Sequence, residues 1–266
     1  MRKVVALMRA SWLTALSYRL NMFFTYTGIV IGIVPLYFIS HALQPMMAST
    51  IKTESPEYFA FLIVGLVTYS FVNTSVNSLH GALSGEIGSG SFEALVSTPT
   101  PLPALLLGMI GQAFSMTTLR ALVLSIAAVA FGAHIVWSGV IPALLILVLV
   151  VFSYLPFGIF AASLILAFRA TGPFPGGIVT ASALLGGVYY PTQVIPSWLA
   201  GFSKFIPLTY GLRSLRRSLL DGAPLSASAA DLAIVAVTTT VLMALSLMAF
   251  VKALGYAKHT GTLTQY

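Results

Sequence analysis

The stretch "VIPALLILVLVVFSYLPFGIFAASLILA", residues 140–167, contains no charged side chain and few polar ones. An apolar run longer than about 18 residues is typical of a helix that crosses a lipid bilayer. Inside lipid, only helices and closed barrels satisfy every backbone hydrogen bond, and a barrel strand alternates polar with apolar residues. This run does not alternate, so it predicts a membrane-spanning helix.

The composition of the whole chain agrees with that stretch. Of its 266 residues, 58% are hydrophobic and only 7% are charged, whereas about a quarter of the residues in a soluble domain are charged. The composition therefore predicts an all-α integral membrane protein. The chain has no Cys, which excludes disulfides and thiolate metal sites. Its net charge of +7 indicates cytoplasmic anchoring and lipid head-group contact rather than nucleic-acid binding.

Six segments are long and apolar enough to be predicted crossings: 22–42, 58–79, 103–133, 140–167, 176–191 and 230–254. The fifth spans only about 24 Å at ~1.5 Å per residue, less than the ~30 Å hydrocarbon core. The sequence after it is apolar but is broken by Pro191, Pro196 and Pro207. We expect a re-entrant or interfacial hairpin that completes the fifth crossing and lies against other helices.

Residues 1–21 precede the first crossing and are predicted to form an interfacial amphipathic helix. At 100° per residue, Val4, Met8 and Trp12 share one face of that helix. A solvated basic tail is the alternative. Residues 22–266 would then form a single transmembrane domain. Four basic residues predict a cytoplasmic N-terminus, and six crossings return the C-terminus to the same side; these residues are Arg2, Lys3, Arg9 and Arg19.

The same count places residues 80–101 in the cytoplasm and residues 43–57, 134–139 and 192–229 outside. The last of these loops conflicts with the charge rule, because four basic residues stand there against Asp221. We keep the count because N-terminal charges usually dominate orientation. A helix would gather three of the basic residues on one side, to hold lipid phosphates or guide an anionic substrate. This predicted outer basic cluster comprises Lys204, Arg213, Arg216 and Arg217.

Several function classes lack their required residues. No Lys follows a Gly, so the chain has no nucleotide-binding P-loop, and no His precedes a Glu, so it has no HExxH zinc site. All six carboxylates fall in loops or at segment ends, where they cannot carry a proton through the membrane. We therefore predict no catalytic site, metal or cofactor in this chain. Three classes of protein remain: a channel, an assembly or insertion factor, and a pore subunit driven by an ATPase on another chain.

The segment "GEIGSGSFEALVSTPTP", residues 85–101, holds two of the six carboxylates and no basic residue. Its "SFEALVS" portion predicts a short surface helix with Ser91 as N-cap and Glu93 in the first turn. Gly90 permits the turn into this helix and Pro99 ends it. An acidic cytoplasmic feature joined to two spans is a surface on which a separate ATPase can act. The alternative is that both carboxylates are solvated loop charges.

With these residues, the chain resembles the permeases of ABC type-2 transporters. "EIGSGSFEALVSTP", residues 86–99, is similar to the family's Glu, then Gly-Thr-x-Glu-x-Leu-x-x-Thr-Pro segment, with Ser91 where Thr is usual. "GGVYYPTQVIPSWLAGFSKFIPLTYGLRSLRRSLLDG", residues 186–222, is similar to the family's Gly-Val-aromatic-Pro, Leu-Pro, Pro-Leu-Thr-Tyr and Arg-x-x-Leu run, with Ile195 at the Leu-Pro position. The order of the two stretches and the six-span layout match over nearly the whole chain.

The resemblance implies a permease subunit of an exporter that moves a drug, lipid or glycan out across the cell inner membrane. It implies a pathway made by two copies, or by this chain and a close relative, and driven by two ABC-type ATP-binding subunits that hold ATP and Mg. It also implies outer re-entrant helices and a cytoplasmic coupling helix. The coupling residues would be Glu86, Gly90, Ser91, Phe92, Glu93 and Pro99. The competing hypothesis is a membrane pore, assembly or scaffold protein with no ATPase partner.

Further residues are candidates for the pathway and for subunit contact. Arg120 lies within the third span, where it either lines the pathway or extends to the cytoplasmic interface. Gly28 and Gly32 form a GxxxG motif, which permits close helix contact either in a dimer or within one subunit. The aromatic candidates for a gate also fit an interfacial belt, and the asparagines also fit bonding between helices. The predicted pathway or gate residues are Asn73, Asn77, Arg120, Tyr189, Tyr190, Trp198 and Phe202.

Overall fold

The computed structural model describes residues 19–52, 54–88, 102–168 and 170–259. These residues form helices and connections with no strand among them, as predicted for an all-α protein. Within the described ranges, five helices are long and apolar enough to cross a membrane. They are α2 (Arg19–Ile51), α3 (Tyr58–Gly88), α5 (Leu102–Ala130), α6 (Val140–Phe168) and α10 (Ala229–His259). Most of the predicted interfacial helix, residues 1–21, and all of the predicted coupling helix, residues 91–97, fall outside the described residues.

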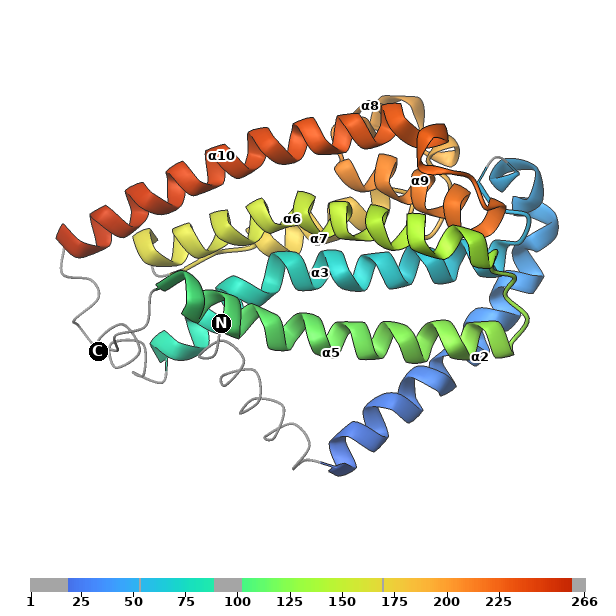
Figure 1. Cartoon of the computed structure of the whole chain (residues 1–266), viewed down its shortest axis with the longest axis horizontal. Coiled ribbons are helices and arrows are strands. Elements are labelled where there is room, and N and C mark those ends of the chain that lie inside the picture. Colours follow the sequence, from blue (N-terminus) through green and yellow to red (C-terminus); the bar gives the residue numbers. More distant parts are fainter. Residues whose placement is uncertain (1–18, 53, 89–101, 169, 260–266) are drawn as a thin grey trace.

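Helices α3, α5, α6 and α10 lie side by side as a bundle, and α2 is inclined to them and approaches them toward its C-terminal end (Figure 1). Helix α3 packs against α2, α5 and α6, and α6 in turn packs against α10. In the most apolar stretch of α3, 67% of the residues are buried, against 6% for α2 and 11% for α10. A helix that is apolar on all sides can be buried on all sides. The high burial of α3 therefore reflects its position at the centre of the bundle. The described residues leave most of the apolar surface of α2 and α10 uncovered.

Shorter elements connect α6 to α10: α7 (Phe174–Leu185), η2 (Thr192–Val194), α8 (Ser197–Ser203), α9 (Pro207–Asp221) and η3 (Leu225–Ser228). With 12 residues, α7 is about 18 Å long and cannot cross a bilayer alone. Pro207 begins α9, and Gly222 ends it in the left-handed conformation at φ 70°. The predicted short fifth segment is therefore present. A sixth crossing made by α7 and the elements after it stays a prediction.

The predicted end of the fifth segment is wrong, because α7 ends at Leu185 and not at residue 191. The predicted ends of two spans are also wrong. Helix α2 continues past residue 42 to Ile51, although it contains Pro45, because Leu43 and Met47 pack on the buried start of α3. Helix α3 continues past residue 79 to Gly88, because Leu79 and Leu83 pack against α6 and α10. Glu86 consequently lies in the last turn of a helix and not in a loop. In both cases tertiary packing extends a helix beyond the point where the apolar run weakens.

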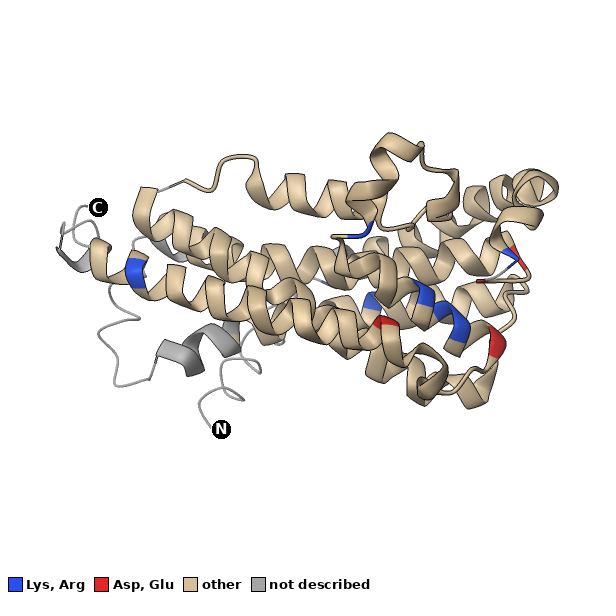
Figure 2. Cartoon of the chain, turned by 90° about the horizontal axis from the view of Figure 1, so that it is seen from above, with Lys and Arg blue, Asp and Glu red and all other residues tan. Residues whose placement is uncertain are grey.

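The connections of the bundle gather at two ends (Figure 1). The α2–α3 connection, the α5–α6 connection and α9 lie together at what we call the α9 end. The last turn of α3, the start of α5 and the last turns of α6 and α10 lie at the opposite end. The three segments predicted to be outside therefore do share one end. Charged residues gather toward the α9 end, whereas long stretches of the bundle carry none (Figure 2).

Candidate functional site

A buried ion pair lies at the α9 end. Arg216 of α9 is 1% exposed and is the largest fully buried side chain of the described residues. Its Nη1 donates a hydrogen bond to Oε2 of Glu54 at 3.0 Å, and Glu54 itself is 5% exposed. A buried charge without a partner is very unfavourable, so each of these residues is tolerated because of the other.

The second terminal nitrogen of Arg216 binds the backbone of two further segments. Nη2 donates to the carbonyls of Phe61, Gly187 and Val188 at 3.2, 2.9 and 3.3 Å. The guanidinium carbon also lies 3.3 Å from the centre of the Phe61 ring. One side chain thus joins α9 to the α2–α3 connection, to α3 and to the segment after α7. Only the planar, multi-donor fork of arginine can make this set of contacts; a lysine ammonium cannot.

The charge state of the pair follows from its surroundings. Burial lowers the pKa of Arg216 to about 10, and the neighbouring Glu54 carboxylate opposes that decrease. The guanidinium therefore stays protonated at neutral pH. Buried pairs add little net stability compared with apolar packing, but the loss of one partner is costly. The main role of the pair is therefore to fix the position of α9.

Close backbone approach surrounds the pair. A Cβ built at Gly65 of α3 would collide with the carbonyl oxygen of Val188 and would lie 3.0 Å from Nη2 of Arg216. The Tyr58 hydroxyl donates to the carbonyl of Tyr189 at 2.8 Å. Helix α3 and the segment after α7 are therefore in direct contact because position 65 carries no side chain.

Two further contacts tie α9 to its neighbours. Arg213 lies 3.7 Å from Asp231 of α10, with 30% and 15% of the two side chains exposed. The Val136 amide of the α5–α6 connection donates to the Leu219 carbonyl at 2.9 Å. Together with the buried pair, these contacts join α9 to elements on every side of it. The α9 end is therefore a single packed unit around one charged centre.

Comparison with known proteins identifies the family. Residues 2–220 match the ABC-2 type transporter family, a range that contains both Glu54 and Arg216. The chain belongs to this family. It is 25% identical over 166 residues to the "Inner membrane transport permease YadH" of Escherichia coli K12, and the aligned part covers 61% of this chain and 63% of that relative. The same values hold for YadH of Escherichia coli O157:H7 and of Shigella flexneri. The chain thus spans somewhat less than two thirds of these relatives.

The predicted outer basic cluster of this ABC-2 chain included Arg216. That prediction is wrong, because Arg216 is buried and paired with Glu54. Lys204 is exposed and Arg217 is partly exposed. A sequence signal for this difference exists, because Arg216 follows Leu212 by four positions and so lies on the buried stripe of α9. Its partner Glu54 could not be identified from the sequence, because 162 positions separate the two residues.

The predicted pathway residues fall into two regions. Asn73, Asn77 and Arg120 lie on α3 and α5, where the Asn77 amide donates to Oδ1 of Asn73 at 2.8 Å and Arg120 is exposed. The predicted gate aromatics Tyr189, Tyr190, Trp198 and Phe202 lie on the connection after α7 and on α8. Polar bonding between helices does occur beside the asparagines, where the Thr74 and Thr117 hydroxyls lie 2.7 Å apart and join α3 to α5.

Gly28 and Gly32 lie on an uncovered part of α2. Both are exposed, and no atom lies within 4 Å of a Cβ built at either position. Of the two interpretations of this GxxxG motif, contact within the subunit is therefore wrong for the described residues. Contact with a second copy stays a prediction.

Proposed function

We propose that this chain is the membrane permease of an ATP-driven exporter in the inner membrane, and that it moves an amphipathic or lipid-linked molecule outward. The observation that carries the proposal is the match to the ABC-2 family over residues 2–220 in a chain that has no P-loop of its own. In this proposal the energy comes from ATP hydrolysis by a partner. Separate ABC-type ATP-binding subunits, which hold ATP and Mg, are the partners that fit.

The geometry of α3 supports such coupling. The helix has 31 residues and is about 46 Å long, and it runs from Tyr58 at the α9 end to Gly88 at the opposite end. Glu86 lies in its last turn, beside the predicted coupling segment, and Gly65 near its start touches the Arg216 site. In this proposal a displacement of α3 near Glu86 is transmitted along this buried helix to the Arg216–Glu54 pair, which holds α9 in position.

The uncovered surface of α2 supports a homodimer. Only 6% of the residues in its most apolar stretch are buried, and beyond the adjoining backbone of α2 no described atom lies within 4 Å of a Cβ added at either motif glycine. Small residues let two helix backbones approach closely in a membrane. In this proposal a second copy packs against α2, and the pathway forms between the two subunits.

The carboxylates of the coupling segment test the proposal. The tagged wild-type chain should bring down a P-loop ATPase from membranes, and the double variant Glu86→Ala, Glu93→Ala should recover much less of it. Both chains should insert into the membrane equally. Glu57→Ala is the matched control, because Glu57 is a partly exposed carboxylate at the α9 end. Equal ATPase recovery from all three chains would contradict the coupling role, and recovery of no ATPase by the wild type would favour a pore or scaffold protein.

A further inference from the structure

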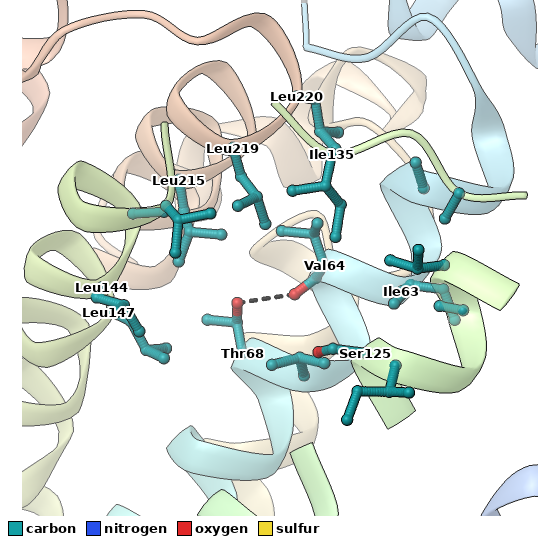
Figure 3. Close-up of a pocket in the computed structure, with 18 of the residues that line it drawn as sticks. Ile63, Val64, Thr68, Ser125, Ile135, Leu144, Leu147, Leu215, Leu219 and Leu220 are labelled. Atoms are coloured by element: carbon teal, nitrogen blue, oxygen red, sulfur yellow. Dashed lines mark hydrogen bonds between the residues drawn. The ribbon is translucent and has the colours of Figure 1, made fainter. Parts of the chain in front are cut away.

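Helices α5 and α6 are consecutive but are held apart. A short connection, residues 131–139, joins them, and both pack on α3, yet they make little contact with each other. Antiparallel helices joined by short loops normally pack together. Between them lies an apolar cleft of about 490 Å³ at the α9 end (Figure 3). The two helices therefore line opposite sides of this cleft and do not pack closely on each other.

The walls of the cleft come from four helices. Ile63 and Val64 of α3 form its floor, and Leu215, Leu219 and Leu220 of α9 close its top (Figure 3). Ala128 of α5 and Ala143 of α6 line its sides with small side chains. Among the residues that the structure describes, no charged side chain lines the cleft. Of its two hydroxyls, that of Thr68 already donates to the Val64 carbonyl of its own helix at 2.8 Å.

The mouth of the cleft faces the membrane. Its lips are exposed, with values of 69% for Ile126 of α5 and 55% for Leu144 of α6, whereas Ile63 on the floor is 5% exposed. The lip residues lie within the stretches Ile110–Ala130 and Trp137–Phe168, which are apolar enough to cross a bilayer. The medium outside the mouth is therefore hydrocarbon. We propose that the cleft is a binding site for one acyl chain of a membrane phospholipid.

The chemistry of the cleft favours an acyl chain over other occupants. An apolar cavity of this kind stays dry, and its volume falls within the range of about 300–1,000 Å³ that is usual for small-molecule sites. A polar ligand would find no charge and no free hydrogen-bond network there. Trp137 stands at the rim beside the α9 end and is 80% exposed. Tryptophan favours the head-group level of a bilayer, so the phospholipid head would lie beyond Trp137 and its chain would extend inward.

Photo-crosslinking tests this site without any knowledge of the exported molecule. The full-length protein is placed in nanodiscs that contain a phospholipid with a diazirine in one acyl chain, and the adducts are mapped by peptide mass spectrometry. Adducts should concentrate on peptides that carry cleft residues of α5, α6 and α9. Ser125→Phe places a ring in the cleft where the acyl chain would lie and should remove most of those adducts. Ala130→Phe is the matched control, because Ala130 is exposed on the same helix and lies outside the cleft.

A second variant distinguishes the loss of lipid binding from poor folding. Val140→Phe fills the cleft from α6 and should give the same decrease, with size-exclusion profiles and helical circular dichroism like those of the wild type. Three outcomes would overturn the proposal: equal labelling of the cleft in wild type and both filled variants, adducts spread evenly over the outward faces of α2 and α10, or a copurified protein crosslinked at the cleft in place of lipid.

Discussion

Glu54 and Arg216 form a buried ion pair across 162 positions of sequence, with 3.0 Å between their charged atoms. Glu54 lies in the connection before α3, and Arg216 lies in the last turns of α9. Their contact closes the α9 end of the bundle, because the same guanidinium also binds backbone carbonyls of α3 and of the segment after α7. If α9 moves during transport, this set of contacts is what must be released or carried with it.

Removal of Arg216 should destabilise the protein strongly. Arg216→Met leaves the Glu54 carboxylate buried without a partner, which typically costs about 3–5 kcal/mol. Thermal unfolding in detergent should show this loss, whereas Arg217→Met, at a partly exposed position, should change stability by less than about 0.5 kcal/mol. The double variant Glu54→Gln, Arg216→Met should be more stable than Arg216→Met alone. Equal stability of the Arg216→Met and Arg217→Met variants would show that the buried pair does not hold α9 in position.

A methyl group at position 65 should have a large effect for its size. Gly65→Ala forces the Val188 carbonyl and the Arg216 guanidinium away from α3, so we expect a clear decrease in unfolding temperature. Gly81→Ala in the same helix is the control, because no atom lies within 4 Å of its added carbon. That control should be neutral or should stabilise the protein by up to about 1 kcal/mol, since alanine favours a helix more than glycine does. Indistinguishable unfolding of the two variants would contradict the close packing at Gly65.

The sequence predicted the all-helical fold class and grouped residues 43–57, 134–139 and 192–229 at one end of the bundle, because both follow from the order of the apolar segments. It misplaced the ends of α2 and α3, where Leu43 packs on the start of the next helix and Leu83 packs on helices distant in sequence. Arg216 was placed in the outer basic cluster because spacings of three and four would gather Arg213, Arg216 and Arg217 on one side of a helix. Its position four residues after Leu212 signals the buried face of α9, but its contacts with Glu54 and with the carbonyls after α7 join segments that no local pattern relates.

Bulky residues on α2 should weaken the dimer but not the subunit. Gly28→Leu and Gly32→Leu add side chains where the subunit has open space, so the unfolding temperature of the monomer should hardly change. Single-molecule photobleaching in nanodiscs should then show fewer two-step traces. Gly81→Leu, which also adds a side chain in open space, should leave the dimer fraction unchanged. A decrease of the same size in that control would show that the GxxxG motif is not the contact.

Engineered cysteines should report the orientation of the bundle, since the chain has no Cys of its own. Lys204→Cys occupies an exposed position at the start of the α8–α9 connection and should react with an impermeant thiol reagent on intact cells. Ser89→Cys should react only after the cells are permeabilised. The reverse pattern would place the α9 end in the cytoplasm and would contradict outward export.

ATP hydrolysis by the purified assembly tests the central claim, that this chain is the membrane subunit of a separately powered transporter. The tagged chain is isolated in mild detergent, exchanged into nanodiscs and assayed for ATP turnover with Mg present and absent. We predict Mg-dependent hydrolysis that copurifies with the wild-type chain and falls to background in the Glu86→Ala, Glu93→Ala variant. A wild-type preparation that is folded and dimeric but shows no ATP hydrolysis and contains no P-loop protein would contradict the account.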